Sequence, residues 1–174
     1  MTRRAELGLI DEVSVAVSVP AKSTPLAMGR ATEASWRRTV GVVIAVFAAF
    51  ATGAVLSWES FGSSEGPSFF YPAAGVTAAT MMLTRRALWP WIAVAVVAAE
   101  ILVDTLYGNP LWVSSGFAVA NVVEPVIGAS LTLAWCGGRP DLSKRRDFAV
   151  FIAAACLIAP VFGGMIGGSV IAHQ

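Results

Sequence analysis

The chain has few charged residues, few cysteines and almost no histidine, and each shortage excludes a class of protein. Charged residues make up 13% of its 174 positions, about half of their share in a typical soluble domain. One histidine and two cysteines, Cys136 and Cys156, do not supply the ligand set of a zinc or iron–sulfur site. A net charge of +1 is not the basic excess of a nucleic-acid-binding protein. We therefore expect no metal, no cofactor, no nucleic-acid partner and two free thiols.

Common catalytic patterns are missing as well. The sequence contains no HExxH, no glycine-rich phosphate loop and no serine, histidine and aspartate arranged as a triad. The only histidine, His173, lies at the end of an apolar run, and we interpret it as an exposed interfacial side chain. We therefore expect that the protein is not an enzyme.

Hydrophobic residues make up 56% of the chain and gather in long runs. Runs of about 20 apolar residues are typical of transmembrane helices. They predict an all-α, polytopic bundle in a lipid bilayer, with about five spans at 40–58, 69–84, 88–107, 111–135 and 148–173. The second run is short, so it either spans with local bilayer thinning or is re-entrant. We favour spanning, because the alternation of charge between loops fails otherwise.

Tryptophan and basic residues support this division. Tryptophan prefers the membrane–water interface, and all six fall at the ends of expected spans: Trp36, Trp58, Trp89, Trp91, Trp112 and Trp135. Basic residues precede the first span and follow the second and fourth, whereas the loops between carry only acidic charges. By the positive-inside rule the N-terminus is cytoplasmic, and we expect a multi-pass membrane protein; together with the family resemblance given below, this topology implies a bacterial inner membrane.

Two domains are expected along the chain. Residues 1–38 are mixed polar and small, with two prolines, and predict a mostly disordered cytoplasmic tail. Residues 39–174 form the expected membrane domain. Because the sequence stops directly after an apolar helix, we expect a fragment truncated at its C-terminus.

Four polar residues of the third and fourth spans form the candidate site for a ligand or signal: Glu100, Asp104, Asn121 and Glu124. The turn at 108–110 makes these spans antiparallel neighbours. At 1.5 Å per residue, Asn121 lies about 4.5 Å deeper than Glu100, within its reach. Residues three or four apart share a helix face, so the two pairs are expected to meet as one acidic patch.

This patch has two interpretations. It is either a small pocket for a cationic or polar signal, a metal ion or a proton, since ionisable groups inside spans mark functional sites, or an interhelical hydrogen-bond cluster with a protonated Glu124. Asp104 by itself is interpreted as a solvated residue at the end of its helix. Pro125 frees the carbonyl of Asn121 and is expected to bend the fourth span.

The last span carries four glycines in small-xxx-small spacing: Gly163, Gly164, Gly167 and Gly168. Such glycines let a second helix approach closely, so we interpret them as packing positions, within the bundle or in a homodimer. Pro160 is expected to kink the same helix.

Three short motifs occur one after another in the second, third and fourth spans, and their order supports a family resemblance. Tyr71-Pro72-Ala73-Ala74-Gly75 opens the second span, Trp89-Pro90 opens the third after a basic pair, and Asn121-Val122-Val123-Glu124 lies inside the fourth. Together they resemble the type-one membrane-associated sensor domain of bacteria, of the MASE family. Tyr71 stands where the family more often has tryptophan, and the family typically has about eight helices where five are expected here.

The resemblance implies a signal-input domain. Its output would be a cytoplasmic domain such as a diguanylate cyclase, a cyclic-di-GMP phosphodiesterase or a histidine kinase, none of which is recognisable in this chain. The signal, a small molecule or an ion, is not identified by the family. Two alternatives from other classes are a small proton- or cation-coupled transporter subunit, and a membrane anchor or dimerisation module.

Overall fold

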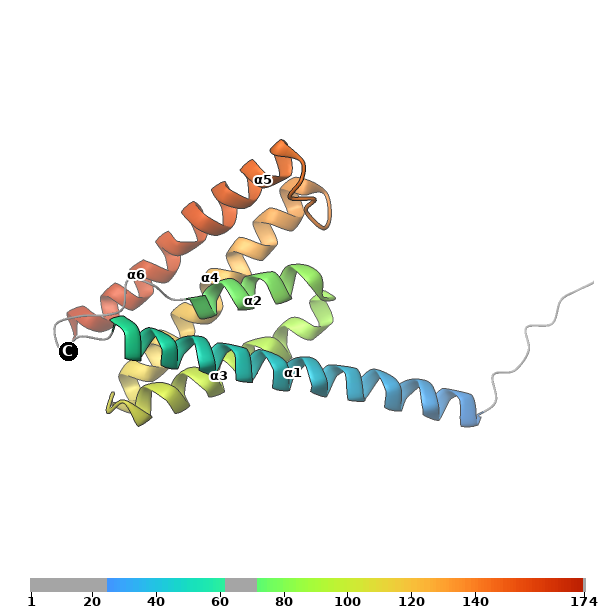
Figure 1. The fold of residues 1–174 in the computed structure, drawn as a ribbon, viewed down its shortest axis with the longest axis horizontal. Coiled ribbons are helices and arrows are strands. Elements are labelled where there is room, and N and C mark those ends of the chain that lie inside the picture. The colour runs from blue at the N-terminus through green and yellow to red at the C-terminus, as the bar shows by residue number, and fades with distance from the viewer. Residues whose placement is uncertain (1–24, 62–71, 174) are drawn as a thin grey trace, which may run out of the picture.

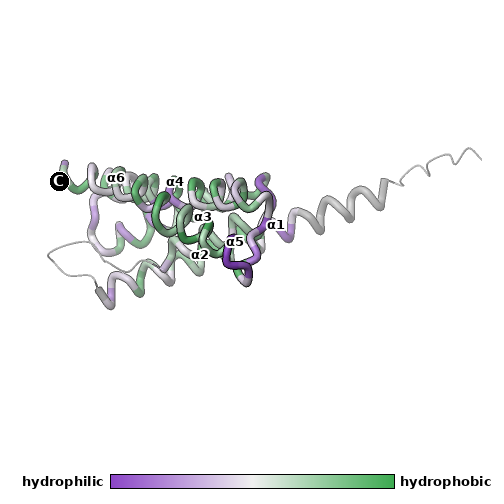
Figure 2. Tube along the Cα trace, turned by 90° about the horizontal axis from the view of Figure 1, so that it is seen from above, coloured by the Kyte–Doolittle hydropathy of each residue, from purple (hydrophilic) through white to green (hydrophobic). Residues whose placement is uncertain are grey.

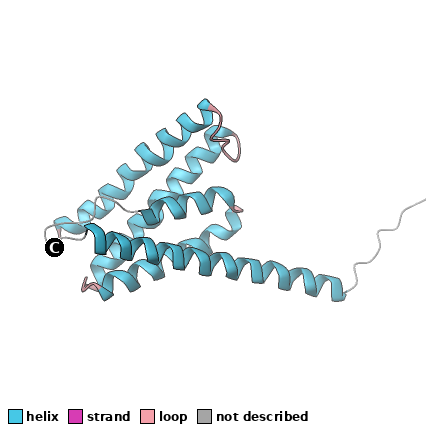
Figure 3. Cartoon of the chain, viewed as in Figure 1, coloured by secondary structure: helices cyan, strands magenta, loops and turns pink. Residues whose placement is uncertain are grey.

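The computed structural model describes residues 25–61 and 72–173, and every element within them is helical (Figures 1 and 3). The elements are α1 (Pro25–Phe61), α2 (Pro72–Leu83), a 3-10 turn (Arg86–Leu88), α3 (Trp89–Leu106), α4 (Leu111–Cys136), α5 (Arg145–Phe151), a π-helical segment (Ile152–Ile158) and α6 (Ala159–Ala172). The all-α prediction is confirmed for this part of the chain.

Four helical stretches are long and apolar enough to cross a membrane: Trp36–Ser60, Arg86–Leu106, Leu111–Cys136 and Arg145–Ala172. They correspond to the first, third, fourth and fifth expected spans. Most hydrophilic residues lie in the turns at the ends of the bundle (Figure 2), which is the arrangement a bilayer requires. The polytopic membrane fold is therefore confirmed.

The second expected span differs from the others. α2 has 12 residues, so it is about 18 Å long and does not by itself cross a hydrocarbon core of about 30 Å. Residues 69–71 of the expected span lie outside the described residues. α2 ends beside the basic turn at 84–86, so it occupies the cytoplasmic half of the bundle.

The first helix begins earlier than the sequence indicated. α1 starts at Pro25 and runs for 37 residues, so it includes the last part of the expected tail. Proline suits the first turn of a helix, where its missing N–H has no intrahelical partner. Residues 1–24 of the expected tail lie outside the described part of the chain.

α4 contacts more elements than any other helix, because α2, α3, α5, the π-helical segment and α6 all pack on it. α1 lies on the far side of α3 and also contacts α2 (Figure 1). The fully buried side chains include Phe50, Met81, Ile92, Val96 and Val113, contributed by all four of α1 to α4. The site described below is arranged around α4 for this reason.

Aromatic pairs hold α1 to α3 at both ends. Near the start of each membrane-spanning stretch, the rings of Trp36 and Trp91 meet edge to face at 6.5 Å between centroids. Near their ends, Trp58 stacks on Tyr107 at 5.2 Å, with the ring planes 8° apart. The two helices therefore run parallel, and their tryptophans mark the two interfaces as the sequence predicted.

The last span changes helix type in its middle. Pro160 lacks an N–H, and its ring would clash with the carbonyl four residues earlier, that of Cys156. The chain widens into π-helical turns over Ile152–Ile158, directly before this proline. The expected kink at Pro160 is thus a local π-helix, a feature that recurs at functional sites.

Candidate functional site

The seam between α3 and α4 holds a buried polar pair. The Asn121 side-chain amide donates a hydrogen bond to Glu100 Oε1 at 2.7 Å, and Glu100 is only 3% exposed. The turn that brings the helices together contains Gly108 at φ +89°, a conformation that glycine adopts without strain. The register counted outward from this turn therefore places the two side chains where the sequence predicted.

Asp104 lies one turn from Glu100, toward the end of α3, and is 5% exposed. The prediction of a solvated helix-end residue is therefore wrong. The side chains of Trp58 and Asn109 lie within hydrogen-bonding reach of its carboxyl group, while Oδ2 has no partner among the described residues. Trp58, which stacks on Tyr107, is thus a neighbour of Asp104 contributed by α1.

Tyr107 closes the same end of the bundle from the outside. Its hydroxyl donates a hydrogen bond to Glu59 Oε1 of α1 at 2.5 Å. This bond to Glu59 is the main cause that raises the pKa of Tyr107 above its ordinary value of 10.0, because the phenol must keep its proton to donate it. α1 and α3 are thus joined by a polar contact beside their aromatic stack.

Glu124 does not join the Glu100–Asn121 pair. Its side chain lies against Gly163 of α6, where an added Cβ would come within 3.1 Å of Glu124 Cβ and still closer to Oε2. The single acidic patch expected from helical spacing is therefore divided: Asn121 bonds to α3, whereas Glu124 faces α6 and a cavity beside α2. Residues three apart on a helix differ by about 60° in direction, which is enough to reach different neighbours.

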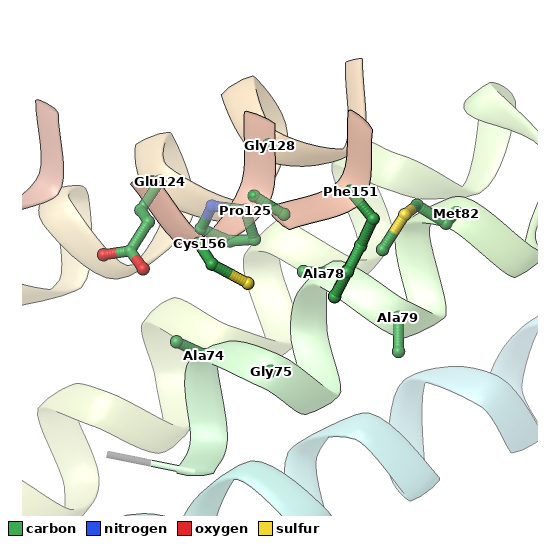
Figure 4. Close-up of a pocket in the computed structure, with 11 residues that line it drawn as sticks. Ala74, Gly75, Ala78, Ala79, Met82, Glu124, Pro125, Gly128, Phe151 and Cys156 are labelled. Atoms are coloured by element: carbon green, nitrogen blue, oxygen red, sulfur yellow. The ribbon is translucent and has the colours of Figure 1, made fainter. Parts of the chain in front are cut away.

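The cavity has a volume of about 130 Å³ and lies between α2, α4 and the first half of the last span. Its α2 wall consists of four small residues and one methionine: Ala74, Gly75, Ala78, Ala79 and Met82. The opposite walls carry Glu124, Pro125 and Gly128 from α4, and Phe151, Ala155 and Cys156 from the last span. In Figure 4 the Cys156 sulfur points into the space between α4 and α2. Among the residues that the structure describes, Glu124 is the only acidic one that lines the cavity.

The cavity exists because the π-helical segment packs closely against α4, while α2, on the opposite side, presents mostly small residues. An added Cβ at Gly128 would lie 3.1 Å from Ala155 Cα and 3.2 Å from Ala159 Cβ, so the π-helical segment sits tightly against α4. Across the cavity, the small side chains of α2 do not fill the remaining space. The spacing of polar residues in the sequence did not predict that Cys156 lines a cavity. The sequence feature that could have indicated it is Pro160, four residues later, which disturbs the helix at Cys156.

The four glycines of α6 divide into two pairs. Gly163 contacts Glu124, and a Cβ at Gly167 would lie 3.7 Å from the Phe117 ring, so both face α4. A Cβ at Gly164 or Gly168 would meet nothing within 4 Å. Only the first pair therefore allows helix approach within the bundle.

The described residues contain no group of three or more His, Cys, Asp and Glu side chains that could hold a metal ion. A family model, MASE1, matches residues 41–173, which is most of the chain. The chain belongs to the MASE1 family. MASE1 domains are membrane-associated sensor domains. Neither the curated proteins nor the solved structures give a significant match.

Two of the three short motifs identified in the sequence meet at the cavity. Pro72 is the first residue of α2, and Gly75 from the same motif lines the cavity opposite Glu124 of the α4 motif. Tyr71 lies outside the described residues. The MASE1 chain is a multi-pass inner-membrane sensor domain, and its cavity is where segments far apart in sequence come together.

The remaining motif, Trp89-Pro90, fixes the end of α2. Trp89 donates its indole N–H to the Met81 carbonyl at 3.0 Å, and Arg86 lies 5.5 Å above the Trp89 ring. Arg139, after α4, donates to the Leu83 carbonyl. These donors satisfy carbonyls that the end of a helix leaves unpaired, so they hold α2 in place beside α4.

Proposed function

We propose that this MASE1 domain is the signal-input part of a protein with a cytoplasmic output, such as a diguanylate cyclase, a cyclic-di-GMP phosphodiesterase or a histidine kinase. The signal binds in the cavity at Glu124. The observation that carries the proposal is an ionisable residue, Glu124, in the middle of a membrane span, on the wall of a cavity that two of the sequence motifs line.

The surroundings of Glu124 support a binding role over a structural one. Among the described residues, no side chain forms a hydrogen bond or an ion pair with its carboxyl group. A polar group in hydrocarbon costs free energy unless a partner satisfies it. A structural carboxyl would have its partner within the fold, as Glu100 has in Asn121. A bound signal would supply the partner that Glu124 lacks.

The position of the cavity explains how a bound signal could change the arrangement of the helices. Its walls belong to α2, α4 and the last span, so an occupant touches three elements at once. A ligand shifts an equilibrium only when it binds two arrangements with different affinity. Glu100 and Asn121 hold the α3–α4 seam, against which the other elements move. The occupied cavity favours one position of α2 and the last span relative to α4.

Matched glutamate substitutions in the full-length protein test this proposal. Glu124→Gln keeps the size of the side chain and removes its charge, so the output activity should change at an unchanged amount of protein in the membrane. Glu59→Gln makes the same chemical change at the outer end of α1, away from the cavity, and should leave the output as it was. Equal output from Glu124→Gln and the wild type, at equal expression, would overturn the proposal.

A further inference from the structure

We infer that the Glu124 cavity takes a compact hydrophobic amine, a molecule of about the size of a benzene ring with one amino group. The amino group binds the Glu124 carboxyl, and the apolar body lies between α2 and the π-helical segment. For its physiological meaning this inference rests on the proposed sensor function, which assigns the cavity to the signal. The binding itself can be measured independently of any output.

Size sets the first limit on the ligand. The cavity volume is about 130 Å³, and an engineered apolar cavity of about 150 Å³ is known to bind benzene. Nucleotides and most metabolites with several polar groups are too large for it. A single ring or a short branched chain fits.

The lining sets the second limit. Alanine, glycine, proline, methionine and phenylalanine make up most of the walls, and among the described residues Glu124 and Cys156 carry the only ionisable side chains there. No lysine or arginine of the described part of the chain lines the cavity, so none of these residues would balance the charge of an anionic ligand. The apolar walls favour a hydrocarbon body, with a single polar head placed at Glu124.

Proton balance distinguishes an amine from other polar heads. In a pair formed by an amine and a carboxyl group, a single proton lies between nitrogen and oxygen. The pair is therefore complete whether Glu124 enters it as a carboxylic acid beside a neutral amine or as a carboxylate beside an ammonium. The resulting pair is a charge-assisted hydrogen bond, roughly twice as strong as a neutral one. An alcohol of the same shape gains only the weaker bond, and a hydrocarbon gains none.

The depth of the cavity along α4 indicates how the ligand reaches it. Glu124 lies 12 residues before the end of α4 at Cys136, about 18 Å along the helix, and 13 residues, about 20 Å, after its start. The cavity is therefore near the middle of the bilayer. Ala79 and Cys156 on its rim are exposed, so the cavity opens on the surface of the described bundle. A hydrophobic amine partitions into the bilayer and reaches this opening from the side.

Cys156 is a built-in reporter for occupancy, since its thiol lies in the cavity (Figure 4). The 174-residue chain carrying Cys136→Ser is placed in lipid nanodiscs, and the rate at which methyl methanethiosulfonate modifies Cys156 is measured by mass spectrometry. Three probes of one shape are compared: cyclopentylamine, cyclopentanol and methylcyclopentane. Cyclopentylamine should protect Cys156 at a concentration about tenfold lower than cyclopentanol, and methylcyclopentane should protect least.

Glu124→Gln should remove the preference for the amine while leaving the weak protection by the other two probes. A second pair of variants keeps the test decisive if this protein does not fold. Gly75→Leu and Gly164→Leu both place a side chain where an added Cβ meets nothing within 4 Å, but only Gly75 lines the cavity. Gly75→Leu should abolish protection by cyclopentylamine, and Gly164→Leu should preserve it.

Equal protection by all three probes would overturn the inference, because the cavity would then select hydrophobic volume alone. A second result would also overturn the inference. If cyclopentylamine slows the modification of Cys136, in a chain carrying Cys156→Ser, as much as it slows that of Cys156, then the amine acts on the bilayer and not in the cavity. Failure of the sensor proposal gives a different result. In that case cyclopentylamine protects Cys156, but Glu124→Gln leaves the output of the full-length protein unchanged.

Discussion

Two polar side chains on α4, three residues apart, have opposite environments. Asn121 is paired with the buried Glu100 across the α3–α4 seam. Glu124 has no hydrogen-bond partner among the described residues and opens into a cavity. Both cost free energy in hydrocarbon, but only the first recovers it within the fold. The pairing favours a structural role for the seam, and the missing partner at Glu124 supports the proposed ligand site.

The contact between Glu124 and α6 gives the largest expected effect on stability. Gly163→Ala places a methyl group against the Glu124 side chain, and overpacking of this kind costs about 1–3 kcal/mol. The free energy of unfolding in mixed micelles should fall accordingly. Gly164→Ala is the matched control, because its Cβ meets open space. In a double-mutant cycle, Glu124→Ala should reduce the cost of Gly163→Ala, and strict additivity would refute the contact.

The seam gives the next largest effect. Asn121→Ala removes the donor to Glu100, and interhelical hydrogen bonds in membranes are worth about 0.6 to 2 kcal/mol. The free energy of unfolding should fall by this amount, with no loss of cyclopentylamine protection at Cys156. Asn121→Ala as stable as the wild type would show that the pair does not hold the seam.

Glu124→Gln should have a smaller effect on stability than Asn121→Ala, within about 0.5 kcal/mol, because no partner in the fold loses a bond. The same micelle experiment measures it beside Asn121→Ala. A loss as large as that of Asn121→Ala would mean that Glu124 is structural after all. The contrast between the seam and the cavity would then disappear.

The smallest effect on stability is expected from the hydrogen bond between Tyr107 and Glu59, and only at high pH. The chain has two tyrosines, so in a Tyr71→Phe protein the absorbance of tyrosinate reports Tyr107 alone. Its midpoint should lie above 10.0, and Glu59→Gln should bring it back toward that value. Because the folded-state pKa is raised, the stabilisation from this bond is complete below pH 10.0 and is lost as pH rises through the folded-state pKa. An unshifted midpoint in the parent protein would contradict the bond.

Much of the architecture follows from the sequence. Apolar runs of sufficient length locate four of the spans, because a bilayer requires every backbone group to be paired within a helix. The tryptophans locate the ends of these spans, and the turn at Gly108 sets the register that pairs Glu100 with Asn121. Each of these features depends on local chemistry or on a short connection, so counting residues is enough to predict it.

The tertiary structure decided the rest. The sequence predicted one acidic patch, but whether Glu124 turns toward α3 or α6 depends on the glycine opposite it, Gly163. The sequence left open whether the short second run spans or is re-entrant, and α2 has only 12 residues. The sequence also did not show that the chain before Pro160 widens into π-helical turns and leaves Cys156 in a cavity. Spacing along one helix determines which residues share a face, whereas a cavity depends on the volumes that several helices leave unfilled between them.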